Sequence, residues 1–280
     1  MTLLGDALIS CALATVLGSG CFLALRYVFY AATYERLRLL LRRRGPGYEM
    51  YTPVVTEELW EGLGASVLVA LGSWALASGH SAHCRLADTS ACLLGWPHPA
   101  APRALHGLFL LMLGWYGQCT VKRWAGPGRR VRVQGLDAAL HHASTLALLA
   151  LSYSVGLLRL GLLAHWLFTV TSPLLAASKL LHCLDVRPAK KVFFLVFAAA
   201  FFAARVLAVP LVLLRCTLYD AWLVPLDWRA AAAGNAGLLL LYCVSLFWFG
   251  RLLGILATGK LDGRPRMVLT AESRRWQKRL

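Results

Sequence analysis

The chain has 280 residues, of which 59% are hydrophobic and only 15% are charged, and its mean hydropathy is +0.61. Soluble domains typically contain about 45–50% apolar and about 25% charged residues, so this composition excludes an ordinary soluble domain and indicates a polytopic membrane protein. The net charge of +16 does not indicate nucleic-acid binding, because the basic residues lie between apolar segments rather than on one patch.

Seven apolar segments pass a spanning-length requirement of roughly 20 residues. They cover residues 7–32, 59–78, 104–121, 138–156, 160–182, 192–214 and 231–257. The first has neither a basic region before it nor a clear cleavage site, so we expect a retained span. The predicted fold class is all-α, with seven transmembrane helices. Three parts are expected: an N-terminal helix with a basic connector (1–54), a compact domain (55–258) and a basic tail (259–280).

The distribution of basic residues predicts the orientation in the membrane. Most of the 29 Lys and Arg residues follow every second segment, and the positive-inside rule makes those loops cytosolic. The N-terminus is then lumenal or extracellular and the C-terminus cytosolic. The residues concerned are Arg36, Arg38, Arg42, Arg43 and Arg44 in the connector 33–57, Lys122, Arg123, Arg129, Arg130 and Arg132 after the third segment, Arg187, Lys190 and Lys191 after the fifth, and Lys260, Arg264, Arg266, Arg274, Arg275, Lys278 and Arg279 in the tail.

The loop 79–103 is lumenal in this orientation and contains Cys84 and Cys92. A local disulfide and a pair of reduced thiols are both compatible with the sequence. The histidines in or beside the loop lack the spacing of metal ligands, so neither a metal nor another cofactor is expected. These histidines are His80, His83, His98 and His106.

An adjacent histidine pair, His141 and His142, lies inside the fourth apolar segment, one to two turns from its cytosolic end. Ionisable residues within spanning segments are functional candidates by default. On a helix, His141 shares a stripe with Thr145 and Ser152, whereas His142 points about 100° away toward the side of Tyr153. A neutral imidazole there could act as a nucleophile or general base toward a lipid. Interhelical hydrogen bonding is the alternative role.

Arg205 lies mid-span, five residues before Pro210. A guanidinium at that depth must pair or face water, so Arg205 either holds an anionic group of a ligand or bonds backbone carbonyls freed by Pro210. Pro173, after Thr169, Thr171 and Ser172, should kink the fifth segment. The remaining polar residues have simpler expected roles: His165 structural, Lys179 snorkelling, and Asn235 bonding between helices.

The sequence around the histidine pair resembles the signature motif of a known protein family. Arg132 to Thr145, running on to Ser152-Tyr153, is similar to the signature of the TLC-domain superfamily, closest to its ceramide synthase branch: an aspartate (Asp137), a short apolar gap, HHxxT, then SY. The resemblance covers roughly residues 55–258. Other matching pieces are Gly114-Trp115-Tyr116, Arg205 with Pro210, Asn235, and Phe247-Trp248-Phe249.

The resemblance implies a six-helix barrel around a lipid tunnel, preceded by one extra span, in the endoplasmic reticulum membrane. It implies fatty acyl transfer from acyl-CoA to a sphingoid-base amine, with His141 and His142 catalytic. The predicted substrate-binding residues are Thr145, Ser152, Tyr153, Ser172 and Arg205. Partners would be membrane lipids, acyl-CoA as co-substrate and a sphingoid base, and the family allows homo- or heterodimers.

One departure from the ceramide synthase pattern keeps two functions open. The acidic HD-x-x-D motif of the span after the histidine pair, together with a glutamate ahead of a lysine, is replaced. Phe168, Thr169, Ser172 and Ala176 stand at those positions. The chain is therefore either an N-acyltransferase or a non-catalytic TLC protein that binds, senses or transports lipids. A channel or secondary transporter is disfavoured, because no inverted repeat is visible.

Overall fold

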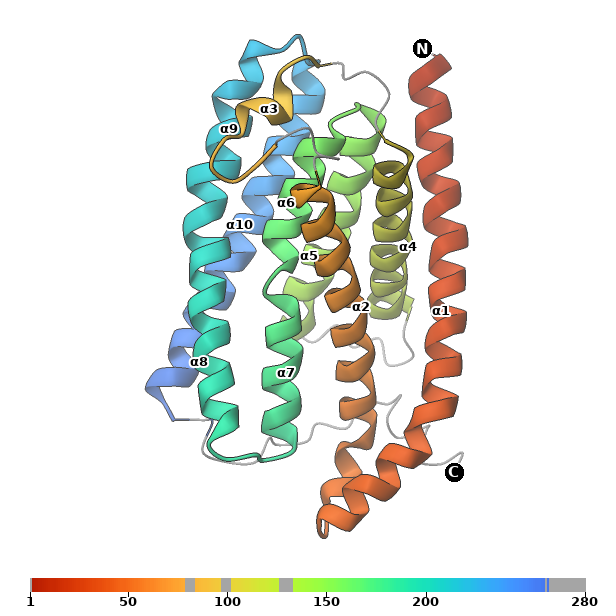
Figure 1. Cartoon of the computed structure of the whole chain (residues 1–280), viewed down its shortest axis with the longest axis vertical. Helices are drawn as coiled ribbons and strands as arrows, with labels where there is room; N and C mark the ends of the chain where they lie inside the picture. The colour runs from red at the N-terminus through yellow and green to blue at the C-terminus, as the bar shows by residue number, and fades with distance from the viewer. Residues whose placement is uncertain (1, 79–83, 97–101, 126–132, 260, 262–280) are drawn as a thin grey trace.

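The computed structural model describes residues 2–78, 84–96, 102–125, 133–259 and 261, and this part of the chain is helical, without strands (Figure 1). The elements in chain order are α1 (Thr2–Arg44), η1 (Tyr48–Tyr51), α2 (Thr52–Ala77), α3 (Ser90–Leu93), α4 (Arg103–Ala125), α5 (Val133–Ser154), α6 (Leu158–Thr169), α7 (Ser172–Cys183), α8 (Ala189–Phe201), η2 (Phe202–Leu214), α9 (Arg215–Leu218), η3 (Asp220–Leu223) and α10 (Trp228–Ala257).

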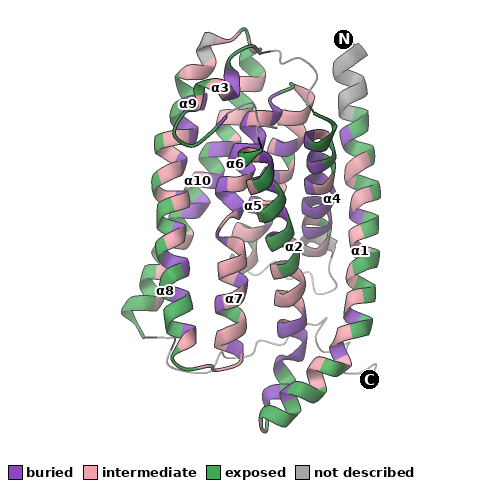
Figure 2. Ribbon diagram, viewed as in Figure 1, coloured by how far each residue is buried: buried purple, intermediate pink, exposed green. Residues whose placement is uncertain are grey.

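Five helical stretches of the described chain are long and apolar enough to cross a membrane, which confirms a multi-pass membrane protein. They are Ile9–Arg44, Tyr48–Ala77, Leu158–Cys183, Ala189–Leu218 and Trp228–Ala257. The long helices run side by side in one bundle (Figure 1). Buried residues lie between the helices, whereas the outward faces are exposed and rich in large apolar side chains, as expected for a surface that contacts lipid (Figure 2).

Helix α1 packs closely on α4 through glycine. A Cβ atom added to Gly18 would lie 2.8 Å from the Cα atom of Gly114, so the two backbones are in van der Waals contact. The hydroxyl of Ser19 also donates to the carbonyl of Gly114 at 3.4 Å. Small residues at helix crossings are the usual means of close association in a membrane. The hydrophobic effect does not drive helices together there, because lipid tails are as apolar as the side chains, so close packing has to do so.

Ion pairs join α1, α2 and α4 near the end of the bundle that carries the basic residues. Glu57 of α2 accepts hydrogen bonds from Arg26 at 2.7 Å and from Tyr30, both of α1. Lys122 of α4 pairs with Glu57 and Glu61. Lys179 was expected to snorkel, but it pairs with Glu58 of α2 at 2.9 Å. The carboxylates of α2 therefore tie three neighbouring helices to it.

The prediction of a connector between helices over residues 33–57 was wrong for most of that range, because most of it is helical. Helix α1 continues to Arg44, and α2 already begins at Thr52. The arginines of this stretch are good helix formers, so the first breaker is Gly45-Pro46. Pro53 lies in the first turn of α2, where its missing N–H costs no intrahelical bond.

The predicted kink before Pro173 is confirmed, because the segment 160–182 is divided into α6 and α7 at Val170-Thr171. A second irregularity lies around Pro210, where η2 is a π-helix. The hydroxyl of Tyr242 donates to the carbonyl of Val206, four residues before Pro210, at 3.4 Å. Both irregular segments lie beside the candidate site described below, which is where π-helical turns commonly occur.

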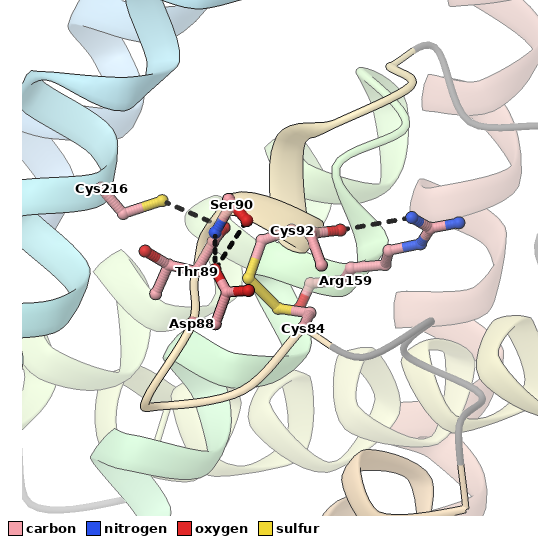
Figure 3. Close-up of a disulfide and its surroundings, with 8 residues drawn as sticks. Cys84, Asp88, Thr89, Ser90, Cys92, Arg159 and Cys216 are labelled. Atoms are coloured by element: carbon pink, nitrogen blue, oxygen red, sulfur yellow. Dashed lines mark hydrogen bonds between the residues drawn. A yellow bond between two sulfur atoms is a disulfide. The ribbon is translucent and has the colours of Figure 1, made fainter.

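A disulfide between Cys84 and Cys92 closes the loop at one end of the bundle (Figure 3). Arg159 donates to the carbonyl of Ala91 at 3.3 Å and so ties the loop to α6. Within the loop, the hydroxyl and amide groups of Ser90 donate to Asp88, and these bonds lower the pKa of the Asp88 carboxyl. Of the two alternatives that the sequence left open, the structure contains the bonded cysteines.

Candidate functional site

His141 and His142 lie on α5 with both rings directed into the bundle rather than toward lipid. Their ring centroids are 5.6 Å apart. His141 is 5% exposed and packs against Trp248 of α10 at 5.1 Å and Phe168 of α6 at 6.4 Å. His142 is half-buried and faces Tyr116 of α4 at 5.8 Å. The pair therefore bridges two sides of the bundle from one helix.

The helical periodicity places the other predicted residues of α5 as expected. Thr145 follows His141 on the same stripe and donates to its carbonyl at 2.8 Å. Tyr153 faces α4, as His142 does, and contacts His106 and Phe109 of that helix at ring distances of 5.5 and 6.3 Å.

An apolar cavity lies between α5, α6, η2 and α10, in the half of the bundle that the disulfide loop covers. Its volume is about 820 Å³, counting the part open to the outside. Thr145 and Ser152 line it, and Leu93 of the loop and Leu226 contribute at its far end. Of the described residues, neither histidine of the pair is part of its wall. The cavity begins one turn further along α5, because Phe168 and Trp248 pack around His141.

A chain of polar side chains connects the surroundings of His142 with the cavity. The hydroxyl of Tyr116, whose ring faces His142, is 3.1 Å from Oγ1 of Thr169. Oγ1 of Thr169 is 3.4 Å from Nε2 of His165, and His165 lines the cavity. The rings of Tyr116 and His165 also meet edge-on at 5.5 Å. His165 was expected to be structural only, and its place in the cavity wall was missed. The one sequence signal was its spacing of four residues from Thr169.

Arg205 is 4% exposed and lies within an aromatic cage beside the histidine pair. Its guanidinium carbon is 5.0 Å from the centroid of Phe201 and 5.7 Å from those of Phe168 and Trp248. Nη2 donates to the carbonyl of Phe168, at the end of α6, so the bonded carbonyl belongs to the break before Pro173 and not to Pro210. Nε and Nη1 are buried without a hydrogen-bond partner. A cation with free donors is suited to binding an anion.

Asp137 lies one turn before His141 and accepts a hydrogen bond from Nε1 of Trp248 at 2.6 Å. Arg251 of α10 also lies 3.6 Å from the same carboxylate oxygen. Since the ring of Trp248 packs on His141, this bond fixes the surface against which the imidazole lies. A carboxylate therefore remains near the pair, although it comes from the helix of the histidines rather than from the next span.

Ser172 begins α7 and is half-buried, and among the described residues it is not part of the cavity wall. Asn235 of α10 does line the cavity and donates to the carbonyl of Thr217 at 3.2 Å, as expected for an interhelical bond. Several predicted features lie outside the described residues: His80, His83, His98, Arg129, Arg130, Arg132 and the tail beyond residue 261.

We expect Arg205→Met to separate ligand binding from stability. Burying a cation with two unpartnered donors is costly, and the cation–π contacts that offset this cost are worth roughly 0.5–2 kcal/mol each. Thermal stability in detergent should therefore change by no more than about 1 kcal/mol. Affinity for acyl-CoA, the anionic co-substrate that the family resemblance implies, should fall by roughly tenfold or more, because charge-assisted hydrogen bonds to an anion are lost. Loss of folded protein with unchanged affinity would assign Arg205 to structure alone.

Fold and site together define a multi-pass helical membrane protein with a histidine pair buried beside an apolar cavity. The TLC domain family profile matches residues 55–254, and the chain belongs to this family.

Among curated proteins, the chain is similar to ceramide synthases. Ceramide synthase 5 of Mus musculus is 26% identical over 161 residues, which cover 58% of this chain and 38% of the relative. Ceramide synthase 4 of Mus musculus is 29% identical over 132 residues, covering 47% and 33%. Ceramide synthase 4 of Homo sapiens is 27% identical over 161 residues, covering 56% and 39%. The alignments thus span less than half the length of each relative.

Proposed function

We propose that this protein transfers a fatty acyl group from acyl-CoA to a sphingoid base or a related lipid amine. The observation that carries the proposal is the placement of His141 and His142. The two rings lie side by side inside the bundle, and Thr145, on the stripe of His141, lines an apolar cavity. The similarity to ceramide synthases supports the same chemistry.

The reaction needs a nucleophile or base that works in an apolar setting. One imidazole nitrogen attacks the thioester carbonyl, the carbon–sulfur bond breaks, and CoA leaves as the thiolate, which takes up the N–H proton of the acylated imidazole. The lipid amine then attacks the acyl-imidazole, the amine proton passes to the released imidazole, and an amide forms. His141 is the better candidate for the acyl acceptor because its stripe leads into the cavity, and His142 is then the base.

Arg205 and Asp137 have supporting roles in this proposal. The free donors of Arg205 hold an anionic part of the substrate beside the pair. Asp137 acts through Trp248 on the position of His141. Tyr153 and Ser172 remain predicted substrate-binding residues, and neither is among the described residues that line the cavity.

We further propose seven spans, with α4 and α5 crossing the membrane beside the five stretches named above, and with residues 55–258 forming a six-helix barrel. The N-terminus is lumenal, the C-terminus is cytosolic, and the membrane is that of the endoplasmic reticulum. The disulfide supports this orientation, because Cys84 and Cys92 lie at the end of the bundle where α1 begins, and disulfides persist in oxidising compartments (Figure 1). A homo- or heterodimer remains a prediction.

A non-catalytic lipid-binding role is the second candidate, and a specific observation favours it. Thr169, Ser172 and Ala176 stand where the ceramide synthase pattern carries acidic residues, and Phe168 stands at its histidine position. Phe168 packs on His141 and Arg205, and Thr169 bonds with Tyr116. These groups cannot bind the ammonium of a sphingoid base as a carboxylate would.

The deciding experiment is ceramide formation by purified protein given sphinganine and palmitoyl-CoA, with the His141→Ala, His142→Ala double variant beside it. We expect product from the wild type and none above background from the double variant. His182→Ala, at the end of α7 and away from the pair, is the matched control and should retain wild-type activity. Equal product from wild type and double variant, or none from either, would eliminate the enzyme hypothesis.

A further inference from the structure

We infer that the cavity takes an aliphatic chain that carries a hydroxyl group part-way along its length. The inference rests on the proposed function, since the chain would be the acyl group delivered to the histidine pair. It concerns a different part of the ligand, however, because it depends on two polar atoms in the cavity wall and not on the reacting centre.

The first of these atoms is Nδ1 of His165. His165 is 4% exposed, it lines the cavity, and its Nδ1 is buried without a hydrogen-bond partner. The other ring nitrogen is already engaged, because Nε2 is 3.4 Å from Oγ1 of Thr169. A buried polar atom left without a partner costs about 1–3 kcal/mol, so an arrangement of this kind indicates that a partner is supplied from outside the chain.

The second atom is Oδ1 of Asn235 on α10, which forms another part of the cavity wall. The amide nitrogen of Asn235 donates to the carbonyl of Thr217 at 3.2 Å, which fixes the orientation of the side chain. Oδ1 is then buried without a partner, and Asn235 also lines the cavity. Two walls of one cavity, α6 and α10, thus each present an unsatisfied polar atom.

The remaining wall is chiefly aliphatic, contributed by residues such as Leu148, Leu160, Leu213 and Leu238. No carboxylate or basic residue other than histidine is among the described residues that line it. A charged head group would therefore be poorly accommodated, and an unsubstituted chain would leave both polar atoms unpaired. A hydroxyl group can satisfy either atom, because it donates to Oδ1 of Asn235, and it donates to or accepts from Nδ1 of His165 according to the tautomer of the ring.

The position of these atoms indicates where the hydroxyl lies along the chain. Ser152, at the level of Gly161 in α6, is eleven residues beyond His141 and therefore about 16 Å from it along the axis of α5. His165 lies one turn nearer to the histidine pair than Gly161. A chain whose carbonyl is at His141 would thus bring its middle carbons, rather than its terminal methyl group, past His165.

The test compares 12-hydroxystearate and 10-hydroxystearate with stearate as competitors of a fluorescent fatty acid, on purified protein in detergent. We expect at least one hydroxylated probe to bind about tenfold tighter than stearate, since one satisfied buried hydrogen bond is worth roughly 1.4 kcal/mol. The His165→Leu, Asn235→Leu double variant should lose this preference, so that the ratio falls to about one. Ser245→Ala, a buried change on α10 outside the cavity wall, should keep it.

Two further measurements keep the result interpretable. His165→Asn retains a polar group near the position of Nδ1 and should restore part of the preference if His165→Leu fails to fold. The comparison is repeated in the His141→Ala, His142→Ala variant, whose binding does not depend on turnover, so failure of the enzyme hypothesis leaves this test intact. Equal affinity for hydroxylated and plain chains in the wild type would overturn the inference. Displacement by cholesterol but by neither hydroxylated fatty acid would also overturn it.

Discussion

His141→Ala should abolish formation of the acyl-enzyme, whereas His142→Ala should allow acylation but slow the transfer to the amine. His141 is the more deeply buried of the two, and its stripe continues into the cavity wall at Thr145. An acyl chain lying in the cavity therefore presents its carbonyl to His141 first. His142 faces Tyr116 and is half-buried, as suits a base that exchanges protons with an arriving amine. Removal of a general base costs about 10²–10⁴-fold in rate.

The measurement uses acyl-CoA with a radiolabelled acyl group. Label retained on the protein without sphinganine reports the first step, and label in ceramide after sphinganine is added reports the second. Ser245→Ala serves as the control for changes within the bundle. If His142→Ala abolished the retained label and His141→Ala did not, the assignment of the two roles would be reversed. Retained label on the double variant would exclude both histidines as the acyl acceptor.

Gly18→Leu should detach α1 from α4 and lower the stability of the protein. A Cβ atom at position 18 would already lie 2.8 Å from the backbone of Gly114, which cannot move aside as a side chain can. The helices must separate, and the bond from Ser19 to the carbonyl of Gly114 is lost with the contact. Overpacking of this kind costs roughly 1–3 kcal/mol. The thermal midpoint in detergent, followed by gel filtration after heating, should fall by several degrees.

Gly20→Leu is the matched control for this prediction. Gly20 lies on the same helix, two residues away, and nothing is within 4 Å of an added Cβ atom. The two variants share the same change in composition and helix propensity, so a difference between their midpoints reports the contact alone. Equal midpoints would show that α1 and α4 do not meet at Gly18 and Gly114.

The helices were largely predictable because apolar length is a strong signal in a membrane protein. Each of the seven predicted segments overlaps a helix, and the break before Pro173 followed from the missing N–H of proline. The ends of the helices were not predictable. Arginine marks the membrane boundary but also favours helix, so α1 continues through Arg36, Arg38 and Arg42 and ends just before Gly45-Pro46.

The candidate site was predictable only along α5. The 3.6-residue period is sufficient to place His141, Thr145 and Ser152 on one stripe. Which residues from other helices meet them depends on packing that a single sequence does not encode locally. Trp248 bonds with Asp137 across 111 residues, and the polar atoms of His165 and Asn235 face one cavity from α6 and α10. The partner of Arg205 was missed because the carbonyl of Phe168 is exposed only by the break between α6 and α7.

The length of α1 has a consequence for how deeply the protein is inserted. At 1.5 Å per residue its 43 residues have a contour length of about 64 Å, roughly twice the thickness of the hydrocarbon core, and the helix bends before its C-terminal end (Figure 1). One half exposes Ile9, Leu13 and Val16, and the other ends in Arg42, Arg43 and Arg44. If α1 were inserted more deeply, guanidinium groups would enter the hydrocarbon core of the bilayer. If it were inserted less deeply, aliphatic side chains would be exposed to water. The two ends of α1 therefore favour one depth in the membrane, and since α4 and α5 pack on α1, they favour one depth for the histidine pair as well.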